Sequence, residues 1–195
     1  RSWDNNFSKG LMRFLPDKLI VNNEVIKKEA IELHDYPEKD ILIGGLPQFD
    51  DYLKAPFQSR EGYFKDIGGD PAKKTVLFAP GSPEEFGGVN LMVPRSMKEA
   101  KQEGILPEDV QFLISNHPHR PNDFSEFAGE KDFIVRWLGT KLGDGRENVE
   151  FSPENSRQLA DMVYYADIVI WMASSIGLDA LVFSKPEIVI NFDGL

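Results

Sequence analysis

The sequence predicts an α/β fold built on a doubly wound parallel sheet. Three segments, TVLFA at 75–79, VQFLIS at 110–115 and IVIW at 168–171, are continuous apolar runs without polar alternation. Such runs are typical of strands that helices cover on both faces. Segments with a helical spacing of apolar residues lie between the runs, so strands and helices alternate along the chain.

Two short apolar strands and three short helices are expected before the first of these runs. In one helix, Val25, Ile26 and Ala30 recur at helical spacing. Another is expected to begin after Ser59, because serine accepts hydrogen bonds from the free N–H groups of a first turn. The strands are predicted at residues 18–23 and 41–44, and the helices at 24–34, 49–53 and 60–67.

The second half of the chain predicts further alternation. Ser96 and Glu99 form an S-x-x-E capping box, which predicts that a helix starts at residue 96. The polar and aromatic segment 121–132 is expected to be a loop or an irregular helix. Weaker strands are predicted at 133–137 and 148–151, and a final strand at 188–191. An amphipathic helix is predicted at 156–165 and a further helix at 176–183.

Composition limits the functional classes. The chain has 195 residues, of which 41% are hydrophobic and 28% charged, and its net charge of −10 disfavours a general nucleic-acid binder. Absence of cysteine excludes disulfides and zinc–thiolate sites and agrees with a reducing cytoplasm. No apolar window is long enough to span a membrane. The chain begins at Arg1 without a methionine or a signal-peptide pattern, so we expect a piece of a longer protein.

Polar clusters follow the three apolar strands, at the point where each strand ends. They are Pro80-Gly81-Ser82, Asn116-His117-Pro118 and Ala173-Ser174-Ser175. In open parallel sheets, ligands bind in the crevice outside the carboxyl ends of the strands. Ser174 and Ser175 stand where a strand turns into a helix, so free backbone N–H groups and hydroxyls would be available to an anion there.

Each of these residues also has a simpler interpretation. Ser175 could be a plain helix cap, and His117 a loop histidine held rigid by Pro118. As a functional residue, His117 could instead donate a hydrogen bond to a phosphate oxygen or protonate a leaving phosphate. His117 and His119 form a His-x-His pair, but no third nitrogen or sulfur ligand is near in sequence, so no metal site is predicted.

The stretch ADIVIWMASSIGLDALVFSKPEIVI resembles the end of the donor-binding domain of GT-B-fold glycosyltransferases of bacterial surface-polysaccharide synthesis. NHP at 116–118 followed by SS at 174–175 is similar to the HP and SS motifs of bacterial sialyltransferases, Kdo transferases and CDP-glycerol glycerophosphotransferases. SWDNNFSKG and the passage from PDKLIVNN to LPQFDDY resemble the interdomain segment of the same broad group. The resemblance covers nearly the whole chain, and it is more specific for the superfamily than for the sugar.

The resemblance implies a set of residues that bind a nucleotide-activated donor. His117 and the Ser174–Ser175 pair would bind its phosphates, and Asp179 would stand where many GT-B enzymes hold the ribose with a glutamate. Asp179 is one methylene shorter, so the alternative is a charge at the start of the helix. The remaining members of the donor site, by position, are Gly81, Ser82, Pro118 and Arg120.

The resemblance also implies a domain division and a Rossmann-like half of a GT-B fold. Residues 1–40 would be the tail of the acceptor domain with the interdomain segment, and residues 41–195 the nucleotide-donor domain, truncated at its end. The acceptor side of the cleft would hold Trp3, Asp4, Asn5 and Lys9. The catalytic base is expected in the missing part of the acceptor domain, so the isolated chain should be inactive.

Three functions stay open. The first is a cytoplasmic glycosyltransferase that moves a sugar from a nucleotide donor to a glycan or lipid-linked acceptor, with no further cofactor and with peripheral membrane association as an alternative. The second is a CDP-glycerol-type polyol-phosphate transferase or a sugar-nucleotide 2-epimerase. The third is a non-catalytic nucleotide-binding module.

Overall fold

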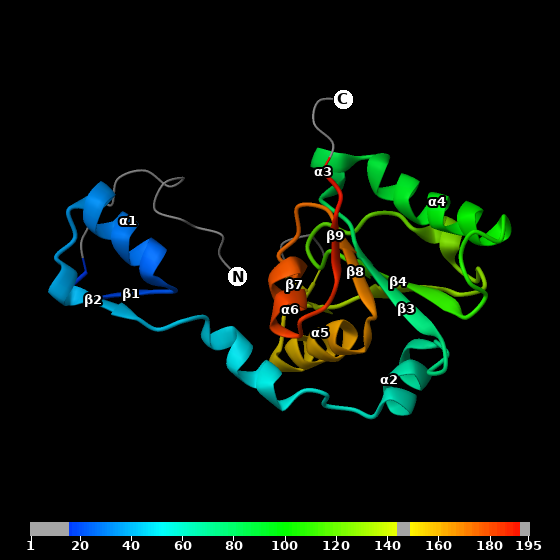
Figure 1. Cartoon of the computed structure of the whole chain (residues 1–195), viewed down its shortest axis with the longest axis horizontal. Helices are drawn as coiled ribbons and strands as arrows, with labels where there is room; N and C mark the ends of the chain where they lie inside the picture. Colours follow the sequence, from blue (N-terminus) through cyan, green and yellow to red (C-terminus); the bar gives the residue numbers. More distant parts are fainter. Residues whose placement is uncertain (1–15, 144–148, 192–195) are drawn as a thin grey trace. The chain divides into compact units, whose positions relative to one another are not determined.

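The computed structural model describes residues 16–143 and 149–191 of the chain. These residues fall into two compact units, which are divided between Asp50 and Asp51. Each unit is a separate body and is described by itself (Figure 1).

The first unit is a small α/β body with its own core. β1 (Leu19–Val21) pairs in parallel with β2 (Ile41–Ile43), and α1 (Glu24–His34) connects them. The Asn23 side chain caps α1 by accepting the N–H of Ile26 at 3.0 Å. Val21, Ala30, Tyr36 and Ile41 form the core.

β2 begins just after residue 40, where the boundary between the two domains is predicted. The strand was predicted as part of the donor domain, but it pairs with β1 because Ile41 and Val21 share the small core of the first unit. The two compact units are divided at 50/51, and the predicted boundary at residue 40 between an acceptor-domain tail and a donor domain stays a prediction. The assignment of the first unit to an acceptor domain stays a prediction.

The second unit confirms the predicted doubly wound parallel sheet. Its strands stand in the order β5-β4-β3-β8-β9, and every neighbouring pair is parallel. This is the order 3-2-1-4-5 of the Rossmann fold. The strands are β3 (Lys74–Ala79), β4 (Val110–Asn116), β5 (Phe133–Trp137), β8 (Ile168–Trp171) and β9 (Glu187–Val189).

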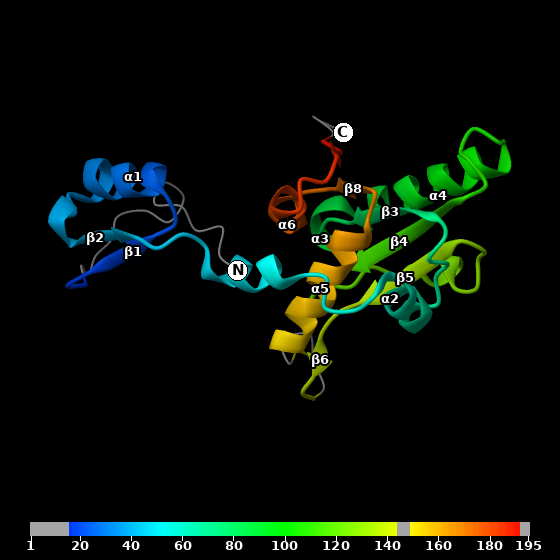
Figure 2. The same cartoon turned by 60° about the horizontal axis from the view of Figure 1, so that its bottom comes forward.

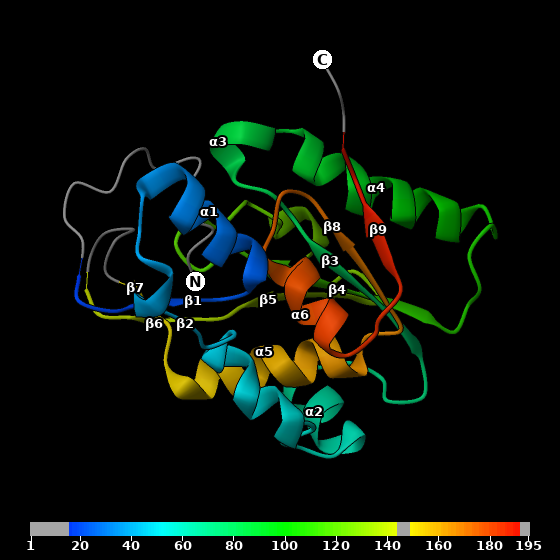
Figure 3. The same cartoon turned by 60° about the vertical axis from the view of Figure 1, so that its left-hand side comes forward.

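Helices cover both faces of this sheet, as the continuous apolar strands predicted. α4 (Val89–Gln102) lies on one face, while α2 (Arg60–Ile67) and α5 (Pro153–Tyr165) lie on the other (Figures 2 and 3). Successive strand residues point to opposite faces, so Phe78 packs on the α4 side and Leu77 on the α5 side. The remaining elements are α3 (Pro83–Phe86), α6 (Ile176–Val182), a 3₁₀ helix (Pro47–Lys54) that begins before the unit boundary, 3₁₀ turns at Glu38–Asp40 and Ser125–Phe127, and the antiparallel pair β6 (Thr140–Lys141) and β7 (Val149–Glu150).

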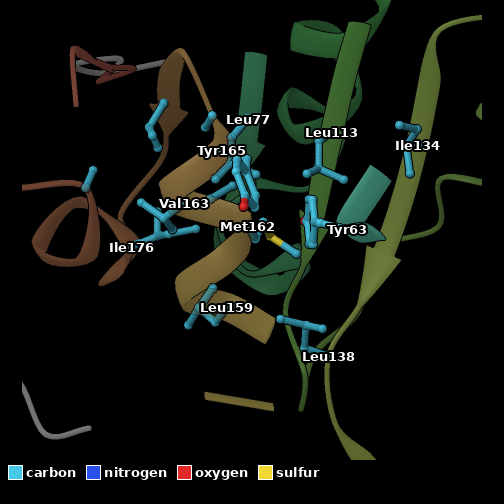
Figure 4. Packing of buried hydrophobic residues seen from close by; sticks show 14 of the residues in the cluster. Tyr63, Leu77, Leu113, Ile134, Leu138, Leu159, Met162, Val163, Tyr165 and Ile176 are labelled. Carbon is cyan, nitrogen blue, oxygen red and sulfur yellow. The ribbon is translucent and has the colours of Figure 1, made fainter. Parts of the chain in front are cut away.

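The core on the α5 face is built largely from α5 and the central strands. Met162 and Val163 of α5 lie beside Leu77 of β3 and Leu113 of β4, and Tyr63 of α2 completes the group (Figure 4). Val163, Leu77 and Leu113 are fully buried. The sheet is therefore a firm support for the loops at its carboxyl edge.

One helix start was predicted wrongly. The capping box at Ser96 predicted a start at residue 96, but α4 begins at Val89 and contains Pro94. Val89, Val93 and Met97 recur at helical spacing and pack against the sheet, so their burial determines where the helix lies. Ser96 itself is exposed on the outer face of α4.

Candidate functional site

The strand order reverses between β3 and β8, where a ligand crevice is expected at the carboxyl edge. β4 and β5 lie on one side of β3, and β8 and β9 follow on the other, so the order reverses between β3 and β8. This reversal is the topological switch point, outside which ligands bind in open α/β sheets. Because all five strands are parallel, the three predicted polar clusters leave the sheet at its one carboxyl edge.

The turn from β8 into α6 carries Ser174 and Ser175. Ala173 before them adopts φ 41°, a left-handed conformation that is costly for a residue with a side chain and that recurs at ligand-binding sites. Ser174 Oγ accepts the N–H of Ile176 at 3.4 Å. Ser175 is the cap residue of α6, but its side chain makes no capping hydrogen bond. The interpretation of Ser175 as a plain helix cap therefore lacks the bond that defines it.

Close packing brings α6 against the end of β8. A Cβ on Gly177 would lie 2.7 Å from the Trp171 ring, so only glycine permits this approach. The Trp171 indole N–H donates to Glu187 Oε2 at 2.6 Å, which fixes the ring between β8 and β9. These contacts determine the position of the turn at Ser174 and Ser175, here called the serine turn.

Asp179 lies one turn further along α6 and is fully buried. Its Oδ1 accepts the hydroxyl of Tyr52 at 2.6 Å. Tyr52 is itself buried and stacks on Phe183 with ring centroids 5.4 Å apart. The ribose-binding role of Asp179 stays a prediction, and the structure adds a second role, which is to hold the segment that enters the second unit.

The loop after β3 is fixed by its neighbours. The Gly81 N–H donates to Asn90 Oδ1 at 3.0 Å, so Gly81 uses this donor within the protein. A Cβ on Gly81 would lie 2.1 Å from the Phe86 ring, which explains the need for glycine. Ser82 Oγ accepts the N–H of Glu85 at 3.3 Å and caps α3. Gly81 and Ser82 thus have local structural roles beside their predicted place in the cleft.

His117 follows β4 with a defined tautomer. Its Nδ1 accepts the backbone N–H groups of His119 and Arg120, at 3.2 and 3.1 Å. An imidazole that accepts at Nδ1 carries its proton on Nε2. Partial burial of the ring, followed by the neighbouring His119 and Arg120, lowers the pKa of His117 below its ordinary value. His117 is therefore a neutral Nε2–H donor at pH 7.

The rest of the His117 loop is tied to its surroundings. The Pro118 carbonyl accepts the indole N–H of Trp137, at the end of β5, at 2.9 Å. Arg120 Nη1 lies 3.9 Å from Glu84 Oε2 at the start of α3, and both side chains are about half exposed. Arg120 thus shares its charge with Glu84 and bridges the loops that follow β3 and β4.

Three asparagines connect these loops. Asn90, Asn116 and Asn122 hydrogen-bond with one another, with Gly81 and with His117. The sequence analysis named Asn116 in the polar cluster after its strand and in the NHP motif, but gave it no role of its own. Asn90 and Asn122 lie 32 positions apart in sequence and carry no local signal that would have joined them.

An open groove of about 440 Å³ lies elsewhere, along the edge strand β5. Its lining includes Phe124, Phe133 and Val135, together with Asn116 and Asn122. It includes none of the predicted donor-site residues, so it is a feature distinct from the switch point between β3 and β8.

Some predictions concern residues outside the described ranges, or concern metal sites and membrane-spanning helices. Trp3, Asp4, Asn5 and Lys9, the expected acceptor-side residues, lie outside residues 16–143 and 149–191. Within those ranges, no group of three or more potential ligands could hold a metal ion. None of the helices in the same ranges combines the length and apolarity needed to cross a membrane.

Comparison with known proteins gives similarity at the level of structure. The chain resembles the wall teichoic acid polymerase TagF (H444N variant) with a TM-score of 0.54 and 18% identity, over 88% of this chain and 38% of that one. It resembles the UDP-GlcNAc 2-epimerase of Methanocaldococcus jannaschii with a TM-score of 0.56 and 16% identity, over 89% of this chain and 46% of that one. Staphylococcus aureus MnaA, determined with UDP, gives 0.58 and 11%, over 90% and 42%.

No family model matches the sequence, and no curated protein matches it. Identities of 11–18% show the fold alone. They agree with the predicted Rossmann-like half of a GT-B-like fold. The chain spans less than half the length of each of the three proteins.

Proposed function

We propose that this chain binds the nucleotide-activated donor in a glycosyltransferase of bacterial surface-polysaccharide synthesis. The observation that carries the proposal is the position of the serine turn and the His117 loop, at the carboxyl edge beside the switch point. Both sequence motifs that resemble donor-site motifs lie there. The acceptor in this proposal is a glycan or a lipid-linked glycan, and the compartment is the cytoplasm or the inner face of its membrane.

Each residue has a defined part in the proposed binding of phosphate. The turn at Ser174 and Ser175 brings two hydroxyls to the carboxyl edge, while the N–H groups of Ile176 and Leu178 in the first turn already donate to Ser174 Oγ and to the Ser175 carbonyl. His117 offers Nε2–H, a donor that does not depend on protonation of the ring at neutral pH. Arg120 adds positive charge, reduced by its contact with Glu84.

These groups suit the leaving diphosphate of a glycosyl transfer. In that reaction an acceptor hydroxyl oxygen forms a bond to the anomeric carbon, and the bond from that carbon to the diphosphate oxygen breaks. The bonding electrons leave with the diphosphate, and the hydroxyl proton passes to a base. Donors aimed at the developing negative charge lower the barrier. The base belongs, in this proposal, to a part of the protein outside this chain.

A second candidate is a transferase of a nucleotide-activated polyol phosphate or a sugar-nucleotide 2-epimerase. The structural resemblance to TagF and to UDP-GlcNAc 2-epimerases favours this candidate, since either chemistry uses a nucleotide diphosphate. The two candidates share the same donor site and differ in the group attached to it. The third candidate is a module that binds a nucleotide at the same site but catalyses no reaction.

The proposal is tested by thermal-shift and calorimetric titration of the whole chain with UDP, GDP, CDP, CMP and dTDP. We expect at least one nucleotide to raise the melting temperature, because a ligand that binds only the folded state stabilises it by mass action. The variant Ser175→Val should abolish this binding, since a β-branched side chain blocks the approach of phosphate. Ser59→Val is the matched control, because Ser59 caps α2 and lies outside the crevice.

Two outcomes would count against the proposal. One is that none of the five nucleotides binds the folded wild-type chain. The other is that binding survives Ser175→Val while the melting temperature falls as much as in Ser59→Val, which is the behaviour of a plain cap. Once a nucleotide is known, its sugar and polyol conjugates distinguish the first candidate from the second.

A further inference from the structure

The two loops on the β3 and β4 side of the crevice are joined by a network of three asparagine side chains. Asn90 Oδ1 accepts the Gly81 N–H at 3.0 Å, and Asn90 Nδ2 donates to the Gly81 carbonyl at 3.2 Å and to Asn122 Oδ1 at 2.8 Å. Asn122 Nδ2 also donates to the Gly81 carbonyl, at 3.1 Å. Asn116 Oδ1 accepts the N–H groups of His117 and Asn122, at 3.1 and 2.8 Å.

The orientation of each amide is determined by backbone groups. A backbone N–H can only donate and a carbonyl can only accept. Asn116 Oδ1 must therefore face the two N–H groups, while its Nδ2 faces the Asn122 carbonyl at 2.8 Å. The Gly81 peptide orients Asn90 in the same way, and Asn90 then orients Asn122. The network has one arrangement that satisfies all of these bonds.

The network ends at the imidazole of His117. Asn116 holds the His117 N–H, and the ring Nδ1 accepts the next two free N–H groups of the loop, those of His119 and Arg120. The conformation of the His117 loop, the tautomer of the ring and the direction of its Nε2–H therefore all depend on Asn116. Asn90 is fully buried and Asn116 is 8% exposed, so water does not replace these bonds at low cost.

We infer that Asn90, Asn116 and Asn122 are positioning residues, which hold the Gly81 and His117 loops in the arrangement that a nucleotide phosphate requires. The inference rests on the proposed function for its ligand. Apart from the Lys101–Asp132 ion pair at the opposite edge, the α4 face of the sheet is mainly apolar, and one attested use of a buried polar network is to specify a single conformation. This network lies only at the carboxyl edge, between the two loops.

A matched control exists at the opposite edge of the same sheet. Lys101 Nζ, near the end of α4, lies 2.6 Å from Asp132 Oδ2, and Lys73 pairs with the other carboxylate oxygen. Lys101→Met should lower the melting temperature without reaching the loops at the carboxyl edge. Comparison with Lys101→Met therefore shows whether an effect on nucleotide binding comes from lower stability alone or from a change in the loops.

The experiment uses the whole chain and compares Asn116→Ala, Asn116→Asp and Lys101→Met with the wild type. Titration with CDP and UDP should show about tenfold weaker binding for Asn116→Ala, the size of one lost hydrogen bond to a charged group. Asn116→Asp keeps an oxygen acceptor for both N–H groups, so it should recover part of the affinity. Lys101→Met should bind as the wild type does. Asn122→Ala, which keeps the backbone bonds of residue 122, serves if Asn116→Ala does not fold.

A second readout needs no nucleotide. The ¹⁵N spectrum of the His117 ring should show a single Nε2–H tautomer in the wild type and in Lys101→Met, and a tautomer mixture in Asn116→Ala. His117→Gln identifies the signals among the three histidines of the chain. An unchanged His117 spectrum in folded Asn116→Ala would overturn the inference, and so would equal nucleotide affinity in the wild type and this variant. If the wild type binds no nucleotide, the proposed function fails, and the ring spectrum alone decides whether Asn116 positions His117.

Discussion

Removing one hydroxyl, with Tyr52→Phe, tests whether the buried Tyr52–Asp179 hydrogen bond holds the second unit together. The hydroxyl donates to a fully buried carboxylate at 2.6 Å, and the ring stacks on Phe183. Phenylalanine keeps the ring, so the change isolates the hydrogen bond. Removing one partner of a buried hydrogen bond costs about 1–3 kcal/mol, because the other group is left unsatisfied. We expect the free energy of unfolding to fall by this amount.

The loss can be measured in two ways. In a domain of this size, it corresponds to a decrease of roughly 2–12 °C in melting temperature. Urea unfolding followed by tryptophan fluorescence should give a lower midpoint with an unchanged slope, because the change leaves the surface exposed on unfolding almost the same. Trp137 and Trp171 both lie in the second unit and report on it.

Tyr63→Phe is the matched control. Tyr63 is 3% exposed, and its buried hydroxyl has no hydrogen-bond partner among the described residues. Removing it should leave stability unchanged or raise it, since no bond is lost and no polar group stays unsatisfied. Equal destabilisation by the two variants would refute the reasoning. If Tyr52→Phe also weakened nucleotide binding tenfold while Tyr63→Phe did not, Asp179 would be part of the donor site as the resemblance implies.

Three further outcomes are expected. Folding lowers the pKa of His117 below the value of about 6.5 expected in the unfolded chain, so its contribution to stability is complete above pH 6.5 and is lost as the pH falls through the lower folded value. In His117→Gln, the melting temperature should therefore change less with pH between pH 7.5 and 5 than it does in the wild type. A pH profile identical to that of the wild type would contradict this. Replacing Ser174 and Ser175 together by alanine keeps the backbone N–H donors, so nucleotide affinity measured by calorimetry should fall only in part; complete loss would place the binding energy in the hydroxyls. Lys101→Met should lower the free energy of unfolding by about 1–3 kcal/mol in urea titration, because it removes one of two cations from the Asp132 carboxylate; no change would show that Lys73 alone suffices.

Strong local patterns made much of the second unit predictable. β5 and β8 occupy the expected residues, and α2 begins after Ser59 as its cap predicted. α4 was missed at its start because a capping-box pattern at Ser96 competed with the burial of the preceding turns. Local propensity contributes about 1 kcal/mol, whereas burial of an apolar helix face contributes several.

The candidate site was predictable only in part. Ser174, Ser175 and His117 each follow an apolar strand, so the parallel-sheet rule placed them at one edge. The ribose role of Asp179 came from the resemblance to GT-B enzymes, whereas its contact with Tyr52 joins residues 127 positions apart in sequence. Likewise, Gly81 needs to be glycine because of the Phe86 ring, which a one-dimensional pattern does not show.

The sequence by itself determined the class of the fold and the edge of the sheet at which chemistry can occur. A continuous apolar run indicates a strand that is buried on both faces, and the residue at which the run ends indicates the carboxyl edge of the sheet. Both can be read from short segments of the chain. Only the tertiary structure decided that β2 pairs with β1, that Tyr52 holds Asp179, and that Asn90 meets Asn122. Those contacts depend on which distant segments meet. Shared apolar burial selects the first of them, and the cost of leaving a buried polar group without a partner selects the other two.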